Sequence, residues 1–376
     1  MLLRAVFNKF SIWLQLSILT ALRLPLFQSL ASASTALFFP LKPLVSLWKR
    51  LSAQAYQILP ATTQLWRGLR ILALDCTALT LPETLWPKFG AHKCCKGQNP
   101  TQCRLAVLYD LATRIPLACR PGHFLKDQDK HLIKKLLAPL NSNTLLIIDA
   151  GFYGFGLFLS FLQKQTHFLI PKIQRAKPKL LQPLGPGDGL YQIRAHCRQR
   201  VFLGARQWMT LRIVTLHRKG FPPRQLVTSL LDPVKFPAED IARLYHERWH
   251  IETFFRDFKH ILSAQSWHAR TLHAFYVELL FFMILSSLTR LAMAQSTKIP
   301  CCLSFEKSLV FVKRILTLSA FVPSTDWNDL YRQLLQYVAT SKIDVRPNRS
   351  FERNLSIRRL QTRNRFIQIR ELKNDA

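Results

Sequence analysis

Apolar residues recur at helical spacing between positions 251 and 262, beside a polar face of unusual composition. At about 100° per residue, one side of an α-helix over this stretch is apolar, comprising Ile251, Phe254, Phe255, Phe258 and Leu262. The adjoining side places one carboxylate among cations and a phenol, namely Tyr245, Arg248, Glu252, Arg256 and Lys259. The pattern predicts a helix over residues 245–259 whose apolar side packs on a core. Its polar side is either a solvated surface with salt bridges from Glu252 to Arg248 and Arg256, or a carboxylate placed for phosphate chemistry.

Two apolar runs upstream each end in an aspartate. Residues 68–76 predict a buried strand that ends at Asp75, and residues 144–149 predict a second one that ends at Asp149. Taken singly, each aspartate has an ordinary explanation in a turn or at a helix N-cap. However, burying a carboxylate without compensation is costly, and functional groups gather at strand ends in open sheets. The pair therefore favours a functional site, to which the helix over 245–259 adds a third carboxylate.

The other apolar patterns complete a mixed α/β arrangement. Short apolar or alternating runs predict further strands at 103–110, 114–119, 167–172, 211–216 and 225–231. Helical patterns cover 127–140, 155–165, a run that starts at Pro237, an apolar segment around 279–288, and 309–318 and 327–338. Residues 173–215 combine many cations with prolines, glycines and alternating runs, which predicts a basic β-rich insertion. The order predicts a mixed sheet flanked by helices, with a β-rich insertion and a helical N-terminal region.

Charge sets the class of partner. The chain of 376 residues has 53 Lys and Arg against 21 Asp and Glu, a formal net charge of +32 and a pI near 10.5. The cations are spread along the whole chain, which favours a protein that binds a polyanion over much of its surface. Nucleic acid is the leading candidate, with an anionic membrane surface and ribosomal-type structural binding as competitors. Because 49% of the residues are hydrophobic, a disordered chain is not expected.

Residues 1–65 predict a helical region, because Leu, Phe and Trp recur among isolated cations, with prolines as breakers. Two interpretations stay open: a small DNA-binding unit, or helices that pack on the following domain. We expect that central domain to span 66–295, with its insertion at about 173–215. A helical, basic C-terminal region is expected over 296–376.

Neither of the two longest apolar stretches predicts a membrane span. Residues 1–22 superficially resemble a signal peptide, yet Lys9 and Arg23 keep the uninterrupted run well below the ~18 residues that a span needs. Residues 279–288 are too short as well and predict a buried core helix. We therefore expect no membrane partner.

The cysteines argue against disulfides and zinc. Eight are present without a regular framework, which in a chain of this size indicates reduced thiols in a cytosolic setting. His92, Cys94, Cys95 and Cys103 are close in sequence, but they contain no Cys-x2-Cys pair. We therefore expect no zinc site there.

The order of elements and one motif together resemble a known family. Tyr245, Arg248, Glu252 and Lys259 reproduce the spacing of the Y-R-E-K signature, and L-D-C-T-A-L, I-D-A-G-F-Y and R-P-N-R-S-F-E-R look like the family's two aspartate regions and its C-terminal motif. Over residues 69–366 the chain resembles DDE transposases of the bacterial insertion-sequence group with this signature (the insertion-sequence-four type), which have a ribonuclease-H-like core. The Y-R-E-K match is specific, whereas either short aspartate motif alone is weak.

The resemblance implies a catalytic triad of Asp75, Asp149 and Glu252. It would bind two Mg²⁺ ions, for which Mn²⁺ is expected to substitute, and catalyse phosphodiester hydrolysis and transesterification of DNA. Three carboxylates suit this chemistry, because Mg²⁺ prefers hard oxygen ligands and two ions stabilise the attacking and leaving oxygens.

The remaining expectations concern DNA. By resemblance, Tyr245, Arg248 and Lys259 grip phosphates beside the cleaved bond, and Arg256 shares their face. A flipped base is expected to need an aromatic partner such as Trp208, for which a place in the core of the insertion is the more ordinary role. We expect terminal inverted repeats and target DNA as partners, a homodimer in the synaptic complex, a DNA hairpin intermediate and a bacterial cytoplasmic, nucleoid-associated location. Two alternatives stay open: an inactive DNA-binding relic, and a basic membrane-associated protein.

Overall fold

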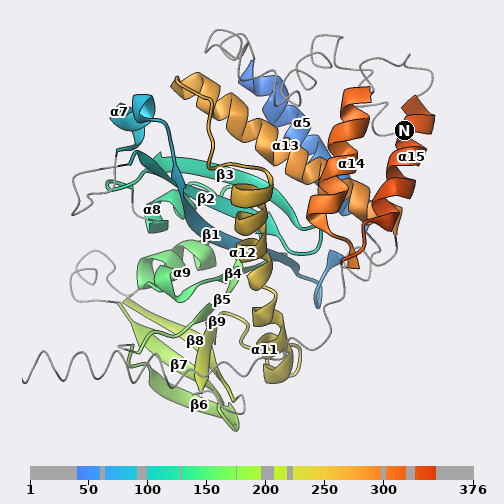
Figure 1. Cartoon of the computed structure of the whole chain (residues 1–376). Coiled ribbons are helices and arrows are strands. Elements are labelled where there is room, and N and C mark those ends of the chain that lie inside the picture. The colour runs from blue at the N-terminus through green and yellow to red at the C-terminus, as the bar shows by residue number, and fades with distance from the viewer. Residues whose placement is uncertain are drawn as a thin grey trace, which may run out of the picture. The chain divides into compact units, whose positions relative to one another are not determined.

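A nine-stranded sheet organises the part of the chain that the computed structural model describes, which is residues 40–59, 64–90, 100–127, 129–174, 176–195, 207–217, 223–297, 302–318 and 327–343. Its strands are β1 Arg70–Thr80, β2 Gln102–Asp110, β3 Ile115–His123, β4 Thr144–Ile148, β5 His167–Pro171, β6 Lys179–Gly185, β7 Asp188–Arg194, β8 Trp208–Leu216 and β9 Arg224–Thr228. Their order across the sheet is β3-β2-β1-β4-β5-β9-β8-β7-β6 (Figure 1).

Helices and single turns precede, connect and follow these strands. They are α5 Leu41–Gln57, η1 Glu83–Leu85, α7 Trp86–Phe89, α8 Asp129–Lys134, η2 Ala150–Phe152, α9 Phe155–Gln163, α11 Ala238–His246, α12 Trp249–Arg256, the π-helix η4 Asp257–Ile261, α13 Leu272–Ser296, α14 Phe305–Leu318 and α15 Trp327–Thr340. α8 is shorter than the helix predicted over 127–140, because residues 135–140 form turns.

Strands β1 to β5 form the mixed sheet that the sequence predicted. β1 is parallel to β4 and β4 to β5, whereas β2 and β3 are antiparallel additions. This 3-2-1-4-5 order is the one expected of a ribonuclease-H-like core. One predicted boundary is wrong, because β1 does not end at Asp75 but continues to Thr80. Its antiparallel pairing with β2 goes on after its parallel pairing with β4 has ended at Leu74.

The predicted basic insertion extends the same sheet beyond β5. β9 pairs antiparallel with β5, and β8, β7 and β6 follow it outward. A fully buried Arg212 on β8 joins this part to the loop before α11. It donates from Nε to Oδ1 of Asp188 (2.8 Å) and from Nη1 to the carbonyl oxygen of Phe236 (2.7 Å), with longer contacts to the carbonyls of Leu230 and Asp232.

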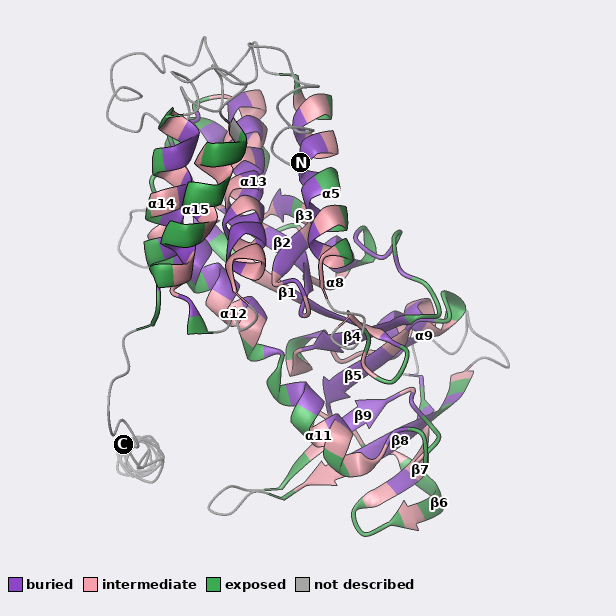
Figure 2. Ribbon diagram, turned by 90° about the vertical axis from the view of Figure 1, so that its right-hand side faces the viewer, coloured by how far each residue is buried: buried purple, intermediate pink, exposed green. Residues whose placement is uncertain are grey.

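Helices cover both faces of β1 and its neighbours. Leu72 and Leu74 belong to a cluster that includes α8 and α9, whereas Ile71 and Ala73 belong to the larger cluster with α5, α12 and α13. Alternation along the strand produces this division. Figure 2 shows the buried residues concentrated where the sheet meets these helices.

α5 packs on α13 and β3, and its apolar side is buried in the larger cluster. For residues 41–57, the N-terminal region therefore consists of a helix that packs on the domain behind it. Residues 1–39 and 344–376 lie outside the described residues, so most of the N-terminal region and part of the C-terminal region are not described. The domain boundaries predicted at residues 65 and 295 stay predictions.

α13 is longer than the apolar run that predicted it. It has 25 residues and, among the described residues, is the one helix that is long and apolar enough, by length and composition, to cross a membrane. Most of its apolar window is buried inside the fold, where it packs against α5, α14 and α15 (Figure 2). It is therefore the buried core helix that the sequence predicted.

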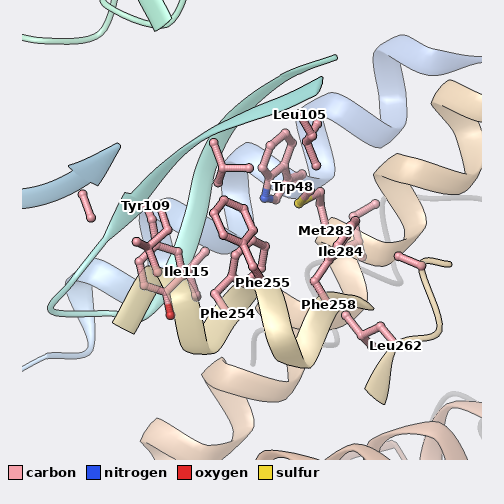
Figure 3. Packing of buried hydrophobic residues seen from close by; sticks show 14 of the residues in the cluster. Trp48, Leu105, Tyr109, Ile115, Phe254, Phe255, Phe258, Leu262, Met283 and Ile284 are labelled. Atoms are coloured by element: carbon pink, nitrogen blue, oxygen red, sulfur yellow. The ribbon is translucent and has the colours of Figure 1, made fainter. Parts of the chain in front are cut away.

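The helix predicted over 245–259 is divided into three parts. α11 ends at His246, residues 247–248 form a turn, and η4 follows α12. Around the turn, hydrogen bonds such as Glu247 N to the Leu244 oxygen (3.0 Å) span three residues, whereas Leu262 N bonds to the Asp257 oxygen (2.9 Å) across five, as in a π-helix. The predicted apolar side is buried throughout, and Figure 3 shows Phe254, Phe255, Phe258 and Leu262 packed in the core.

Candidate active site

Asp75 and Asp149 lie side by side on neighbouring parallel strands. The last parallel pair is Leu74 with Ile148. Asp75 is the next residue on β1, and Asp149 is the residue directly after β4. Since side chains alternate along a strand, both aspartates fall on the face of the sheet that packs against α12. Asp149 then caps η2, where its carboxylate accepts a hydrogen bond from the backbone N–H of Gly151 (3.4 Å).

Arg248 bridges the first aspartate and the glutamate. Its Nη2 lies 2.7 Å from Oε1 of Glu252, one turn along α12, and its Nη1 lies 3.9 Å from Oδ2 of Asp75. Arg248 is 7% exposed, and its Nε has no hydrogen-bond partner within the described residues. The first of the two predicted salt bridges is thus present. In place of the second, Arg256 pairs with Asp257.

The carboxyl group of Asp75 resists ionisation. Burial raises its pKa to about 6, and the negative charges of Asp149 and Glu252 act in the same direction. The backbone N–H of Cys76, which donates to Oδ1 at 2.8 Å, and the charge of Arg248 oppose this shift. A perturbed carboxyl group beside two further carboxylates is typical of a functional site.

Tyr245 brings a second arginine to the site. Its ring and hydroxyl are buried beside Arg248, and burial raises its pKa. The guanidinium carbons of Arg224 and Arg248 lie 5.4 and 5.8 Å from the ring centroid, within the range of a cation–π contact. Arg224 is exposed and begins β9. The sequence does not single Arg224 out, because its only signal is a cation at the start of a strand, which many surface strands share.

The structure does not bring Trp208 to the carboxylates. Arg224, which contacts Tyr245, lies opposite Leu216 at one end of β8. Trp208 is at the other end of β8, opposite Arg194. The Arg194 guanidinium lies 4.5 Å from the indole ring, which is 40% exposed. The interpretation of Trp208 as insertion core is therefore wrong, and its stacking role stays a prediction.

Another indole lies next to the site. Trp249, the first residue of α12, is 57% exposed, and the Arg248 guanidinium lies 5.7 Å from its ring centroid. An exposed aromatic ring beside a cation is a platform on which bases stack. Trp249 is not among the residues predicted from the sequence. Its available signal was a large aromatic residue off the apolar side of a helix, next to the signature arginine.

Lys259 and Arg256 are placed less simply than α-helical spacing predicted. Lys259 lies in η4, so its angle relative to Glu252 differs from that in a continuous α-helix. It is half-buried, and this burial lowers its pKa. Arg256 ends α12 with its side chain 66% exposed. For both residues, contact with phosphate stays a prediction.

The three carboxylates are a donor set that suits a hard divalent cation. Asp75, Asp149 and Glu252 offer only oxygen ligands, which Mg²⁺ prefers, and two of them are adjacent on parallel strands. Within the described residues, no group of three His, Cys, Asp or Glu side chains is assembled as a metal site, and Arg248 contacts two of the three carboxylates. A metal ion bound by these carboxylates would compete with Arg248 for the same oxygens.

Four of the eight cysteines lie in the part of the chain that the structure describes. Cys76, Cys103, Cys119 and Cys302 are free thiols. Cys103 is buried in β2. The rest of the cluster rejected as a zinc site, between residues 92 and 95, lies outside the described residues.

Comparison with known proteins identifies the family of this chain. The family model described as "Transposase DDE domain" matches residues 66–288. The chain is 26% identical over 329 residues to transposase InsG for insertion sequence element IS4 of Escherichia coli (strain K12), covering 81% of this chain and 74% of that protein. A cryo-EM structure of a piggyBac transposase synaptic complex with hairpin DNA matches 75% of this chain at 12% identity and a TM-score of 0.38, and the chain spans 59% of that protein. Because the family match covers more than half of the chain and includes all three carboxylates, this protein belongs to the family of transposases with a DDE domain.

Proposed function

We propose that the chain cleaves and rejoins DNA at the ends of an insertion sequence by metal-dependent phosphoryl transfer. The observation that carries this proposal is the adjacency of Asp75 and Asp149, on the sheet face that packs against the helix of Glu252. Two Mg²⁺ ions, for which Mn²⁺ is expected to substitute, would stabilise the attacking and leaving oxygens when bound. The three carboxylates would hold them, and the Glu252 side chain, 34% exposed, remains accessible to DNA.

The cations around the carboxylates would bind phosphate oxygens. Arg248 has a planar fork of donors that matches two oxygens of one phosphate. Tyr245 places its hydroxyl beside Arg248, and Arg224 adds an exposed guanidinium over the same ring. The net charge of +32 supplies long-range attraction for any DNA duplex. We propose that these groups fix the scissile phosphate, while Lys259 acts further along the backbone.

We further propose terminal inverted repeats and target DNA as the partners, with a homodimer that holds one element end in each catalytic site. The exposed ring of Trp249 supports a DNA hairpin route, because a base that leaves the stack needs a new stacking partner. The chain would act in the bacterial cytoplasm, associated with the nucleoid when bound to DNA. The burial of α13 against α5, α14 and α15 speaks against the membrane-associated alternative.

A cleavage assay tests this function. Purified full-length protein is incubated with a duplex of the inverted repeat that flanks its gene, with Mg²⁺ or with EDTA. We expect nicked and joined products with Mg²⁺ alone, and none from Glu252→Gln. Glu239→Gln, an exposed glutamate on α11, is the matched control and should cut as the wild type does. A wild-type protein that binds the duplex without cutting it would establish the inactive relic instead.

A further inference from the structure

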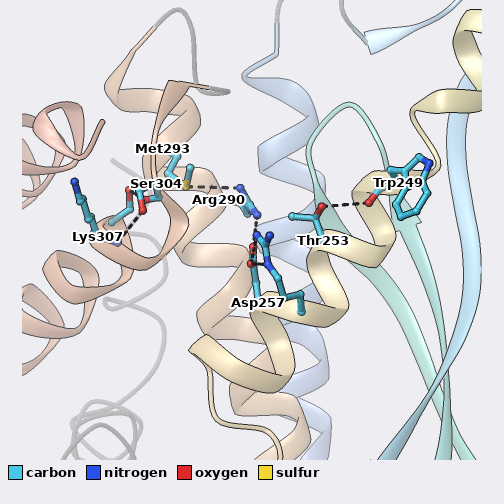
Figure 4. A network of polar contacts seen from close by, with 9 residues as sticks. Trp249, Thr253, Asp257, Arg290, Met293, Ser304 and Lys307 are labelled. Carbon is cyan, nitrogen blue, oxygen red and sulfur yellow. Dashed lines mark hydrogen bonds and ion pairs between the residues drawn. The ribbon is translucent and has the colours of Figure 1, made fainter. Parts of the chain in front are cut away.

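A buried carboxylate lies directly after the catalytic helix. Asp257 is the first residue of η4 and is 2% exposed. Its Oδ2 accepts a hydrogen bond from Nη2 of Arg290 on α13 (3.0 Å), and its Oδ1 accepts from Arg256 (Figure 4). A buried charge must be paired, and here a single negative charge is shared between two guanidinium groups.

The two arginines differ in their surroundings. The Arg290 side chain is 12% exposed, its guanidinium lies 4.6 Å from the ring centroid of Phe305, and its Nη1 lies 4.0 Å from the sulfur of Met293. Arg290 is therefore fixed from several sides. Arg256 is 66% exposed and is held only along one edge.

That one edge determines the orientation of the exposed guanidinium. Both Nε (3.3 Å) and Nη2 (2.9 Å) of Arg256 donate to Oδ1 of Asp257. Within the described residues, the remaining nitrogen, Nη1, bonds to no acceptor. A guanidinium that is held by a carboxylate on one edge loses little rotational freedom when an anion binds its free donors.

A purely structural explanation accounts for only half of this arrangement. Joining η4 to α13 requires the buried contact between Asp257 and Arg290, but not Arg256. An exposed ion pair such as Arg256 with Asp257 adds little stability. Asp257 and its two arginines together carry one surplus positive charge. Arg256 lies four residues after Glu252 and therefore about one turn from the catalytic carboxylate.

We propose that Asp257 and Arg290 are positioning residues, which hold the guanidinium of Arg256 so that its free donors bind a backbone phosphate of DNA passing Glu252. This inference rests on the proposed function, since it takes DNA as the anion. Arg290 fixes Asp257 from the core side, Asp257 orients Arg256, and Arg256 contacts the phosphate.

Binding to DNA without metal tests the proposal separately from catalysis. Full-length protein is titrated with a fluorescent duplex of arbitrary sequence in EDTA over a series of salt concentrations. Arg256→Gln is expected to weaken binding and to reduce the slope of log K against log salt by about 0.9, as the loss of one phosphate contact should. Arg332→Gln is the matched control, because Arg332 is 74% exposed and pairs with Asp329 on α15, and its slope should equal that of the wild type.

The positioning role is tested by a double-mutant cycle. Asp257→Asn should weaken DNA binding when Arg256 is present and have no further effect in an Arg256→Gln background. If Asp257→Asn lowers DNA affinity equally in both backgrounds, Asp257 acts only on the fold. If Arg256→Gln leaves the salt slope unchanged, Arg256 does not contact a phosphate. If Asp257→Asn does not fold, as judged by circular dichroism, Arg290→Lys takes its place in the cycle with the same expectation. A protein that binds DNA but never cuts it refutes the proposed function and leaves this test intact.

Discussion

Arg248 and Glu252 form an ion pair of 2.7 Å across one turn of α12, in which the cation is buried and the carboxylate is 34% exposed. The arginine also approaches Asp75, so it neutralises part of the repulsion between carboxylates that come from different elements. Because a guanidinium does not lose its proton at physiological pH, this compensation is permanent. It allows acidic groups to be gathered on one face of the sheet before any ligand is bound.

Replacing Arg248 by glutamine should reduce DNA cleavage by about a hundredfold, because a donor group aimed at phosphate is lost and carboxylate repulsion is left uncompensated. The single-turnover cleavage rate at saturating Mg²⁺ measures this. Arg243→Gln removes an exposed arginine that pairs with Asp240 on α11 and should leave the rate unchanged. An equal rate in both variants would show that Arg248 serves only the fold.

Asp75→Asn should stabilise the metal-free protein at neutral pH. Its folded-state pKa of about 6 lies above the ordinary value of 3.8, so the folded state binds more protons between these values. Wild-type stability therefore falls as pH rises from about 4 to about 6, and above that the penalty is complete, on the order of 3 kcal/mol. Urea unfolding of both proteins in EDTA across this range measures it. A difference that does not vary with pH would contradict the assignment.

Phe258→Ala should cost about 3–5 kcal/mol of unfolding free energy, because a fully buried ring is removed. Phe258 packs against Phe254 and Phe282 at centroid distances of 5.7 and 5.8 Å. Denaturant unfolding compares it with Val310→Ala, which alters a residue 59% exposed on α14. If both variants lose equally little stability, the apolar side of η4 is not held by the core.

Trp249→Ala should weaken binding of single-stranded DNA by about 1–3 kcal/mol, the contribution of one stacked base. Trp208→Ala should weaken the binding of single-stranded DNA less, because its indole lies at the end of β8 that is distant from the carboxylates. Quenching of tryptophan fluorescence by oligonucleotides compares the two variants. If Trp208→Ala weakens binding more than Trp249→Ala does, the stacking residue is Trp208.

The parts of the fold that depend on local pattern were predictable from the sequence. The continuous apolar runs that lead to Asp75 and Asp149 indicated buried strands, and the spacing of the phenylalanines indicated the buried side of α12. Pattern could not show that β1 continues past Asp75, because that extension depends on pairing with β2. Nor could it show the turn at residues 247–248 or the π-helix after it, since a one-residue change in hydrogen-bond span leaves the apolar spacing nearly intact.

The candidate site was predictable only where its residues belong to a motif. Arg248 and Glu252 share one helix, so their spacing in sequence already implied contact. Arg224 meets Tyr245 only because β9 and α11 are brought together by the fold. Trp208 was chosen for its residue type within a basic segment, and residue type alone does not say at which end of a strand the side chain lies.

Arg212 gives the sheet extension a mechanical role. Its guanidinium joins Asp188, at the start of β7, to the backbone that leads into α11. Separating these parts would leave a permanently charged group unpaired in the interior. Pulling the outer strands away from α11 would therefore first have to break the contacts of Arg212, which makes this arginine a mechanical link between β7 and the segment that leads to Tyr245.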